Sequence, residues 1–373
     1  MPNHVIVSTC GTSLLTNGAD SELKDLLNRT ANHEHEELTQ QELVNVDRRA
    51  RECEQRLGMA SVSSVRKLSA ELNGLLGFYG NQIHSGRNDV HFLIHTDTYQ
   101  GEQVAKILEQ WLRNNKLNVT RILAEDLNTR DLASFHHGLS FLVQWCEASL
   151  RGYQEKNYSI IFNLVGGFKS LQGFMQTLGM VYADEILYIF ETGEELLRIP
   201  KLPFELELSV LDTVRNNLSV FRRLSAKGST LPQHQVRNKG IPETLLYVLG
   251  DECELSPWGR IVWERLKRDI YSERLLESPT TKIRFSSGFK REVESLEKDR
   301  IRKINERIDD LMLYLESNQQ RNPNRLDFKK LRGDPCPPAT HECDAWADEA
   351  AWRIFGHYEG SEYVLDSLGK GLH

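Results

Sequence analysis

The sequence contains no hydrophobic run that approaches the ~20 residues needed to span a bilayer. Its first residues, Met1-Pro2-Asn3-His4, lack the basic and apolar regions of a secretory signal. Both absences argue against a membrane protein or a secreted one, so we expect a soluble, cytoplasmic protein. Tandem repeats and low-complexity tracts are missing too, which argues against a repeat architecture.

Cysteine is sparse and has no metal-binding or disulfide pattern. The six residues show no C-x2-C pair and are scattered along the chain, which predicts reduced thiols: Cys10, Cys53, Cys146, Cys253, Cys336 and Cys343. Cys336, His341 and Cys343 lack a fourth ligand at a finger-like spacing, and the acidic run 33–37 fits a solvated loop. We therefore expect neither a metal nor a resident cofactor.

The sequence has no large excess of either positive or negative charge. Its 373 residues include 46 Lys or Arg and 53 Asp or Glu, which gives a net charge of -7. The distribution is uneven. Residues 281–333 hold 14 basic and 9 acidic side chains, whereas residues 334–373 hold 2 and 8. A basic segment beside an acidic tail fits a polyanionic ligand. The length predicts two or three domains.

Short apolar segments alternate with helical segments in the first half of the chain. The expected strands cover residues 5–7, 90–95, 119–123, 158–164 and 185–190. Residues 101–114 carry apolar side chains at helical spacing. This alternation predicts an α/β domain with a doubly wound, mostly parallel sheet, in which ligands bind at the carboxyl ends of the strands.

Three polar loops follow these predicted strands. Gly11-Thr12-Ser13 offers hydroxyls and main-chain N–H groups at the start of a helix, an arrangement that suits phosphate. Gly166-Gly167-Phe168-Lys169 adds a flexible turn and a positive charge, and Thr96-Asp97-Thr98 lies between the two in sequence. Each loop alone is also typical of an ordinary strand-to-helix connection. Together they favour nucleotide binding.

Residues 1 to about 200 resemble the CARF domain of CRISPR-associated proteins. The motifs that carry the resemblance are Gly11 to Leu14, Thr96 to Thr98, Gly166 to Lys169 and Asp184-Glu185-Ile186. The resemblance implies a Rossmann-like homodimer whose shared groove binds a cyclic oligoadenylate, with cyclic tetra-adenylate as the expected activator. The binding residues that it implies are Ser8, Thr9, Gly11, Thr12, Ser13, Thr96, Asp97, Thr98, Gly166, Gly167, Phe168 and Lys169. Some domains of this family slowly cut their activator, and the sequence does not separate binding from cleavage.

The alternation of strands and helices stops near residues 199–203. We predict a CARF-like domain over 1–204, a helical or winged-helix-like connector over 205–278, and an α+β domain over 279–373. In the last domain a strand over 282–286, two helices over 288–317 and several short strands are expected.

Basic side chains gather in this last domain. Lys329, Lys330 and Arg332 fall on a predicted strand, where alternation places Lys330 and Arg332 on one face and Lys329 on the other. Alternation also lets Arg353 and His357 point one way on a later strand. A solvated edge strand explains any one of these residues. All of them together suit metal-free RNA cleavage, which needs cations around a phosphate, a base and an acid.

Residues 280–373 resemble the RelE family of mRNA interferases. The matching features are Ile283-Arg284-Phe285, the helical hairpin ending at 311–315, Lys329 to Gly333, Arg353-Ile354-Phe355 and Lys370. The resemblance implies attack of an RNA 2′-hydroxyl on the adjacent phosphate, usually on mRNA in the ribosomal A site, leaving a 2′,3′-cyclic phosphate.

The RelE resemblance also implies roles for individual residues. Arg353 would stabilise the phosphorane, while Lys329, Lys330 or Arg332 would hold the phosphate or act as base. His357 or Tyr358 would supply acid–base chemistry or base stacking, with Lys370 nearby. Glu342-Cys343-Asp344 lacks the basic residue that the family usually has at that place, so base and acid stay unassigned.

Both resemblances together predict a type III CRISPR accessory effector, in which cyclic oligoadenylate activates ribosome-dependent mRNA cleavage by paired RelE-like domains. Three alternatives remain. The first is a ligand-responsive transcriptional regulator with a winged helix. The second is a HEPN-type ribonuclease, although Arg353-x3-His357 is one residue shorter than the HEPN signature. The third is a ring nuclease with an inactive toxin-like domain.

Overall fold

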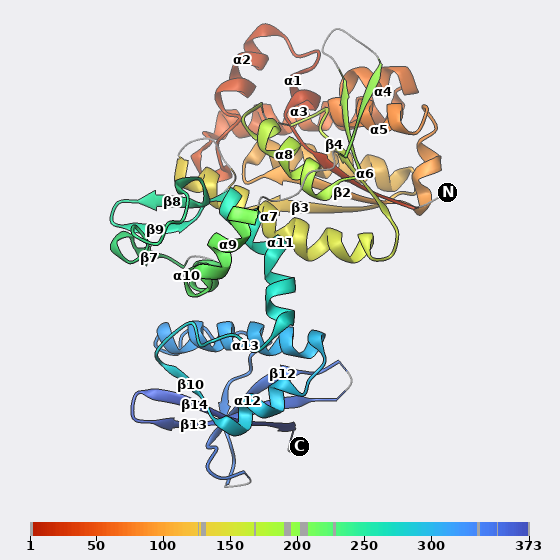
Figure 1. Ribbon diagram of the computed structural model, residues 1–373. Coiled ribbons are helices and arrows are strands. Elements are labelled where there is room, and N and C mark those ends of the chain that lie inside the picture. Colours follow the sequence, from red (N-terminus) through yellow and green to blue (C-terminus); the bar gives the residue numbers. More distant parts are fainter. Residues whose placement is uncertain are drawn as a thin grey trace. The chain divides into compact units, whose positions relative to one another are not determined.

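The computed structural model describes residues 3–125, 127, 132–167, 169–189, 195–201, 208–226, 229–333, 336–348 and 350–371, without the side chains of residues 132, 169, 170 and 208. The chain forms two compact units, Met1–Phe204 (unit 1) and Glu205–His373 (unit 2) (Figure 1). The sequence analysis divides the second unit further at residue 278, and that division stays a prediction.

Unit 1 contains a six-stranded sheet in the order β3-β2-β1-β4-β5-β6. The first five strands in this order run parallel, and only β6 is antiparallel to its neighbour β5. The strands are β1 (His4–Thr9), β2 (Val90–Thr96), β3 (Asn118–Ala124), β4 (Ser159–Asn163), β5 (Glu185–Ile189) and β6 (Leu196–Pro200). The predicted α/β class and the parallel sheet are confirmed.

Five α-helices lie between β1 and β2, where a simple βαβ unit has one. They are α1 (Ser13–Thr16), α2 (Ser21–Arg29), α3 (Gln40–Met59), α4 (Val62–Leu68) and α5 (Ala70–Phe78). The remaining helices of unit 1 are α6 (Tyr99–Asn114), α7 (Leu132–Gln154) and α8 (Lys169–Tyr182). Hydroxyl caps define several helix starts: Ser69 caps α5 and Thr98 caps α6. The five-helix insertion brings α5 to the carboxyl end of β1.

Apolar side chains of the parallel strands form the core of unit 1. Ile6, Leu93 and Ile161, from three adjacent strands, pack with Leu72 of α5 and Leu108 of α6. These strands are buried along almost their whole length, as is usual for a sheet covered by helices. The polar loops at the strand ends therefore rest on a rigid base.

Unit 2 begins with helices and a small three-stranded sheet, ordered β7-β9-β8. Its elements here are α9 (Leu208–Asn216), α10 (Leu218–Leu224), β7 (Leu231–Pro232), β8 (Leu246–Leu249), β9 (Glu252–Leu255) and α11 (Pro257–Glu273). The sequence analysis expected mostly helix here and missed the hairpin. Gly250 has a φ of 59° in its two-residue turn, a conformation that glycine adopts readily. Between β7 and β8, a fully described stretch, there are only 3₁₀ turns and no α-helix that could serve as a recognition helix.

The second half of unit 2 is a five-stranded sheet in the order β10-β14-β13-β12-β11, with β10 parallel to β14 and the other pairs antiparallel. Its elements are β10 (Ile283–Phe285), α12 (Ser287–Glu294), α13 (Lys298–Glu316), β11 (Lys329–Lys330), β12 (His341–Trp346), β13 (Trp352–Glu359) and β14 (Glu362–Lys370). Helix α13 lies along one face of this sheet (Figure 1), where Ile308 and Leu311 pack on Cys343 and Ile354. The opposite face of the sheet is called the outer face below.

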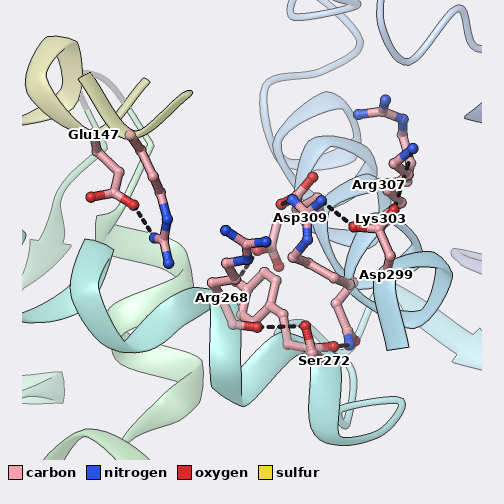
Figure 2. Close-up of polar contacts among 12 residues, drawn as sticks. Glu147, Arg268, Ser272, Asp299, Lys303, Arg307 and Asp309 are labelled. Carbon is pink, nitrogen blue, oxygen red and sulfur yellow. Dashed lines mark hydrogen bonds and ion pairs between the residues drawn. The ribbon is translucent and has the colours of Figure 1, made fainter. Parts of the chain in front are cut away.

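A buried polar network joins the two halves of unit 2. Asp309 of α13 accepts hydrogen bonds from Arg222 Nε of α10, at 2.7 Å, and from the Tyr271 hydroxyl of α11. Asn305 Nδ2 of α13 donates to the Tyr271 carbonyl at 2.9 Å. Figure 2 shows Asp309 among the side chains between α11 and α13. These buried hydrogen bonds anchor α10 and α11 to α13, although Arg222 Nη2 is left without a hydrogen-bond partner among the described residues.

No helix in the described part of the chain is both long and apolar enough to cross a bilayer.

Candidate functional sites

The first candidate site lies where the strand order of unit 1 reverses, between β1 and β4. Such a switch point leaves a crevice at the carboxyl ends of the strands. The loop after β1 and the loop after β4 meet there: the Thr9 hydroxyl donates to the Gly166 carbonyl at 2.6 Å. A Cβ on Gly11 would approach Gly167 N to 2.8 Å, and Gly167 has a φ of 112°. The structure thus brings the first and third predicted loops together, and their glycines permit the close approach.

Two hydroxyl groups at the end of β1 have hydrogen-bond partners within the protein. Ser8 and Thr9 are buried, and Ser8 Oγ accepts from Asn163 Nδ2 at 3.1 Å. Thr12 and Ser13 are half-buried at the start of α1. All four lie at the carboxyl end of β1 or shortly after it, and their role in binding stays a prediction. The buried Thr9 and Ser8 hydroxyls bond within the protein and stabilise the loop.

Glu71 of α5 is a site residue of unit 1 that sequence reasoning missed. Its side chain is fully buried, and its Oε1 accepts from Gly11 N–H at 2.8 Å. Its Oε2 accepts from Ser69 Oγ at 2.6 Å and from Ser13 Oγ at 3.3 Å. Burial raises the pKa of Glu71, although these hydrogen bonds oppose the shift. In the sequence Glu71 is an acidic residue in the first turn of a helix, which is too common a pattern to mark a site.

The second predicted loop lines a different space. Thr96 and Thr98 are buried and bonded to each other through their hydroxyls at 2.9 Å, and Thr98 also caps α6. With Asp97 they border a cavity of about 430 Å³ whose lining includes four carboxylates and one arginine: Glu34, Glu36, Asp97, Glu102 and Arg121. Excess negative charge there disfavours phosphate. Binding of a cyclic oligoadenylate by Thr96, Asp97 and Thr98 stays a prediction, and this charge favours contact with a part of the ligand other than its phosphates.

His95 at the end of β2 also lines this cavity. Its Nδ1 lies 3.1 Å from the Thr96 carbonyl, so Nδ1 carries the hydrogen and Nε2 is an acceptor. Burial lowers the pKa of His95, so the ring is neutral near pH 7. Two predicted binding positions lie outside this description: Phe168 is not among the described residues, and the Lys169 side chain is not described.

The second candidate site is the outer face of the five-stranded sheet in unit 2. Arg353 on β13 pairs with Asp344 on β12, directly opposite it in the register. Arg353 Nη1 also lies 3.2 Å from Asp327 Oδ2, the same oxygen that Lys329 Nζ of β11 contacts at 2.6 Å. Asp327 therefore brings two predicted cations, Lys329 and Arg353, into one cluster. Sequence reasoning named neither Asp327 nor the pairing role of Asp344.

His357 lies on the same face of β13, four residues after Arg353, as alternation predicts. Its Nδ1 is 2.7 Å from Asp366 Oδ2 of β14. Asp366 is the extra residue of a bulge opposite Phe355 and Gly356, and a bulge redirects a side chain. The Asp366 carboxylate holds Nδ1 and leaves Nε2 available for proton transfer.

The remaining predicted residues of unit 2 are elsewhere. Lys330 lies opposite His341. Tyr358 packs edge-on against the His341 and Tyr363 rings, with ring centroids 5.2 and 5.0 Å away, on the side of the sheet that α13 covers. Arg332 lies beyond the end of β11, in a bend and not on the strand expected for it. Lys370 is exposed at the end of β14. The structure thus joins Lys329 and Arg353 through Asp327, and it places His357 on the same face of β13 with Asp366 as its own partner.

Among the described residues, no cluster of three or more His, Cys, Asp or Glu side chains could hold a metal ion.

Comparison with known families adds one match. The model of a family described as CRISPR-associated protein (Cas_APE2256) matches residues 66–202. The match supports a CRISPR association. It spans α5 with Glu71, the loop after β2 and the loop after β4, but neither the loop after β1 nor unit 2. No curated protein matches the chain.

Proposed function

We propose that the chain is a type III CRISPR accessory effector in which unit 1 senses a cyclic oligoadenylate and unit 2 cleaves RNA. Unit 1 would act as a CARF-like homodimer, with cyclic tetra-adenylate as activator. The CRISPR-associated match supports the cellular role. The two glycine loops at the switch point of the sheet support a nucleotide ligand.

The observation that carries the cleavage proposal is the pairing of Lys329 and Arg353 through Asp327, with His357 on the same face of β13. In the proposed reaction the RNA 2′-oxygen attacks the adjacent phosphorus, the bond from phosphorus to the 5′-oxygen breaks, and a 2′,3′-cyclic phosphate remains. Arg353 and Lys329 stabilise the extra negative charge of the phosphorane. The His357 Nε2 serves in proton transfer to or from the reacting oxygens.

Each cation of this cluster already has a carboxylate partner. A bound phosphate must therefore replace Asp327 and Asp344 as the partner of Arg353. The side chains of both aspartates keep contact with water, with 43% and 24% of their surface exposed, so water can solvate them when a phosphate takes their place. We expect RNA to bind weakly unless the ribosome presents it, because nearby carboxylates repel its backbone.

The test is cleavage of labelled mRNA by the purified full chain, with and without cyclic tetra-adenylate and ribosomes. We expect cleavage that needs both, is insensitive to EDTA and leaves 2′,3′-cyclic phosphate ends. Arg353→Ala removes the charge at the centre of the cluster, and we expect a loss of about 10²–10³-fold. Lys290→Ala, an exposed cation on α12, is the matched control and keeps activity.

The outcomes separate the alternatives. Cleavage of free RNA without ribosomes would support a HEPN-type mode of action. Loss of cyclic tetra-adenylate without RNA cleavage would support a ring nuclease. If RNA is never cleaved and Arg353→Ala behaves as the wild type, the ribonuclease proposal is wrong.

A further inference from the structure

Glu71 occupies the hydrogen-bond donors that a phosphate would take at the loop after β1. Gly11 N–H and the Ser13 hydroxyl both point to its carboxyl group. Gly166, from the opposite loop, is so close that a Cβ there would lie 2.2 Å from Glu71 Oε1. A single carboxyl group therefore lies directly beneath both glycine loops.

The surroundings of this carboxyl group are uncharged. Among the described residues no Lys, Arg or His forms an ion pair with Glu71; its partners are Gly11, Ser13 and Ser69. The titratable neighbour is the buried Cys10 thiol, whose pKa is raised by burial and by Glu71. An ionised carboxylate without a cation is costly inside a protein, and an anion bound above it would raise that cost.

We propose that Glu71 controls anion binding at this loop: its carboxylate holds Gly11 and Ser13 while the loop is empty, and an anionic ligand binds together with one proton that neutralises Glu71. The inference rests on the proposed function, since it requires that unit 1 binds an anion. The proton comes from solvent and bonds to Glu71 Oε2. Protonated Oε2 donates to Ser69 Oγ and releases the Ser13 hydroxyl to the ligand, while Oε1 can still accept from Gly11 N–H until the ligand takes that donor as well.

The proposal makes ligand affinity depend on pH with a defined sign. Burial raises the pKa of Glu71 in the free protein, and the bound anion raises it further. Affinity therefore falls as pH rises through the interval between these two values, by up to about tenfold for each pH unit. His95 is neutral and the Cys10 thiol protonated from about pH 7 to about pH 9, since burial lowers the first pKa and raises the second. These two groups therefore do not contribute to the pH dependence in that range, and the difference between wild type and Glu71→Gln isolates the contribution of Glu71.

The experiment measures the dissociation constant of cyclic tetra-adenylate for the full chain over this pH range. We expect the wild-type constant to rise with pH, whereas Glu71→Gln, which keeps the shape and removes the charge, gives a flat profile and tighter binding at the upper end. Asp89→Asn is the matched control. Asp89 is a buried carboxylate at the amino end of the parallel strands, directly before β2, where it accepts from His4 N at 2.8 Å and the Tyr79 hydroxyl at 2.8 Å. This variant keeps the wild-type slope.

Calorimetry of the wild type in two buffers of different ionisation enthalpy gives the same answer without a variant: we expect proton uptake on binding at pH values where Glu71 is ionised. Binding without uptake, and with the same pH profile in wild type and Glu71→Gln, overturns the inference and leaves the sensor function intact. If neither the wild type nor Glu71→Gln binds cyclic tetra-adenylate, both this inference and the proposed sensor function are wrong.

Discussion

The two candidate sites of this protein satisfy their polar groups in opposite ways. In unit 1 the loop after β1 gives its donors to Glu71, a fully buried carboxyl group without a charged partner among the described residues. In unit 2 the cations Lys329 and Arg353 meet Asp327, whose side chain is 43% exposed. Water can replace a partner on the outer face of unit 2 but not beneath the loop of unit 1. Replacing a hydrogen-bond partner is therefore expected to cost less free energy on the outer face of unit 2 than beneath the loop of unit 1.

Two buried carboxylates, Glu71 of unit 1 and Asp309 of unit 2, also differ in their hydrogen-bond partners. Glu71 is held by neutral donors alone, whereas Asp309 in unit 2 is paired with Arg222, whose side chain is only 1% exposed. Removing the charge of Glu71 thus eliminates an electrostatic cost. Removing Asp309 instead leaves a buried guanidinium without its counter-charge.

The largest expected effect is therefore on the stability of unit 2. Asp309→Ala should lower its free energy of unfolding by about 3–5 kcal/mol, because Arg222 and the Tyr271 hydroxyl lose their shared acceptor. Denaturant unfolding followed by circular dichroism measures the loss. Asp299→Ala, which removes a half-exposed partner of Arg302, should cost at most about 1 kcal/mol. Equal losses in the two variants would contradict the buried role of Asp309.

The buried His91 of unit 1 should make the free energy of unfolding depend on pH, with a somewhat smaller effect than the loss of Asp309. Burial lowers the pKa of His91 to about 4, whereas the unfolded chain has its ordinary value of 6.5. The unfolded state therefore binds the extra proton in this interval, and stability falls by up to about 3 kcal/mol as pH drops through it. His91→Gln should remove this part of the acid sensitivity in urea titrations at several pH values, and the exposed His84→Gln should not. If His91→Gln keeps the wild-type acid sensitivity, His91 is not the group responsible.

The two faces of the sheet in unit 2 allow a test on adjacent residues. Lys329→Ala removes a cation that shares Asp327 with Arg353, and we expect RNA cleavage to fall by about 10²-fold. Lys330→Ala removes a positive charge from the other face of the sheet, and its RNA cleavage should fall less than that of Lys329→Ala. Single-turnover cleavage rates decide between them. A larger loss for Lys330→Ala would place the reaction on the side that α13 covers.

The smallest expected effect is on the rate of RNA cleavage and depends on the orientation of the His357 ring. Asp366→Asn replaces the carboxylate that lies 2.7 Å from His357 Nδ1, so the ring loses its charged partner while the bulge is kept. We expect cleavage to slow by about tenfold, a part of the ~10²–10⁴-fold that general acid–base catalysis supplies. The affinity for substrate should not change. Unchanged rates would show that His357 needs no positioning by Asp366.

The strands of unit 1 could be predicted from sequence because each is a short apolar segment next to a polar turn. The loops at Gly11 and Gly166 were expected at the carboxyl ends of these strands, and they meet there. Glu71 could not be predicted, since its role depends on an insertion of five helices that returns α5 to the end of β1. The strand β11 ended earlier than expected, which moved Arg332 into a bend.

The sequence by itself determined the alternation of strands and helices, the positions of the glycine turns and the enrichment of cations near residue 330, because these depend on neighbouring residues. Only the tertiary structure decided which carboxylate meets which donor. Glu71 reaches Gly11 across 60 residues, and Asp327 joins Arg353 across 26. Such long-range pairs follow from the packing of whole elements, and local sequence carries no record of them.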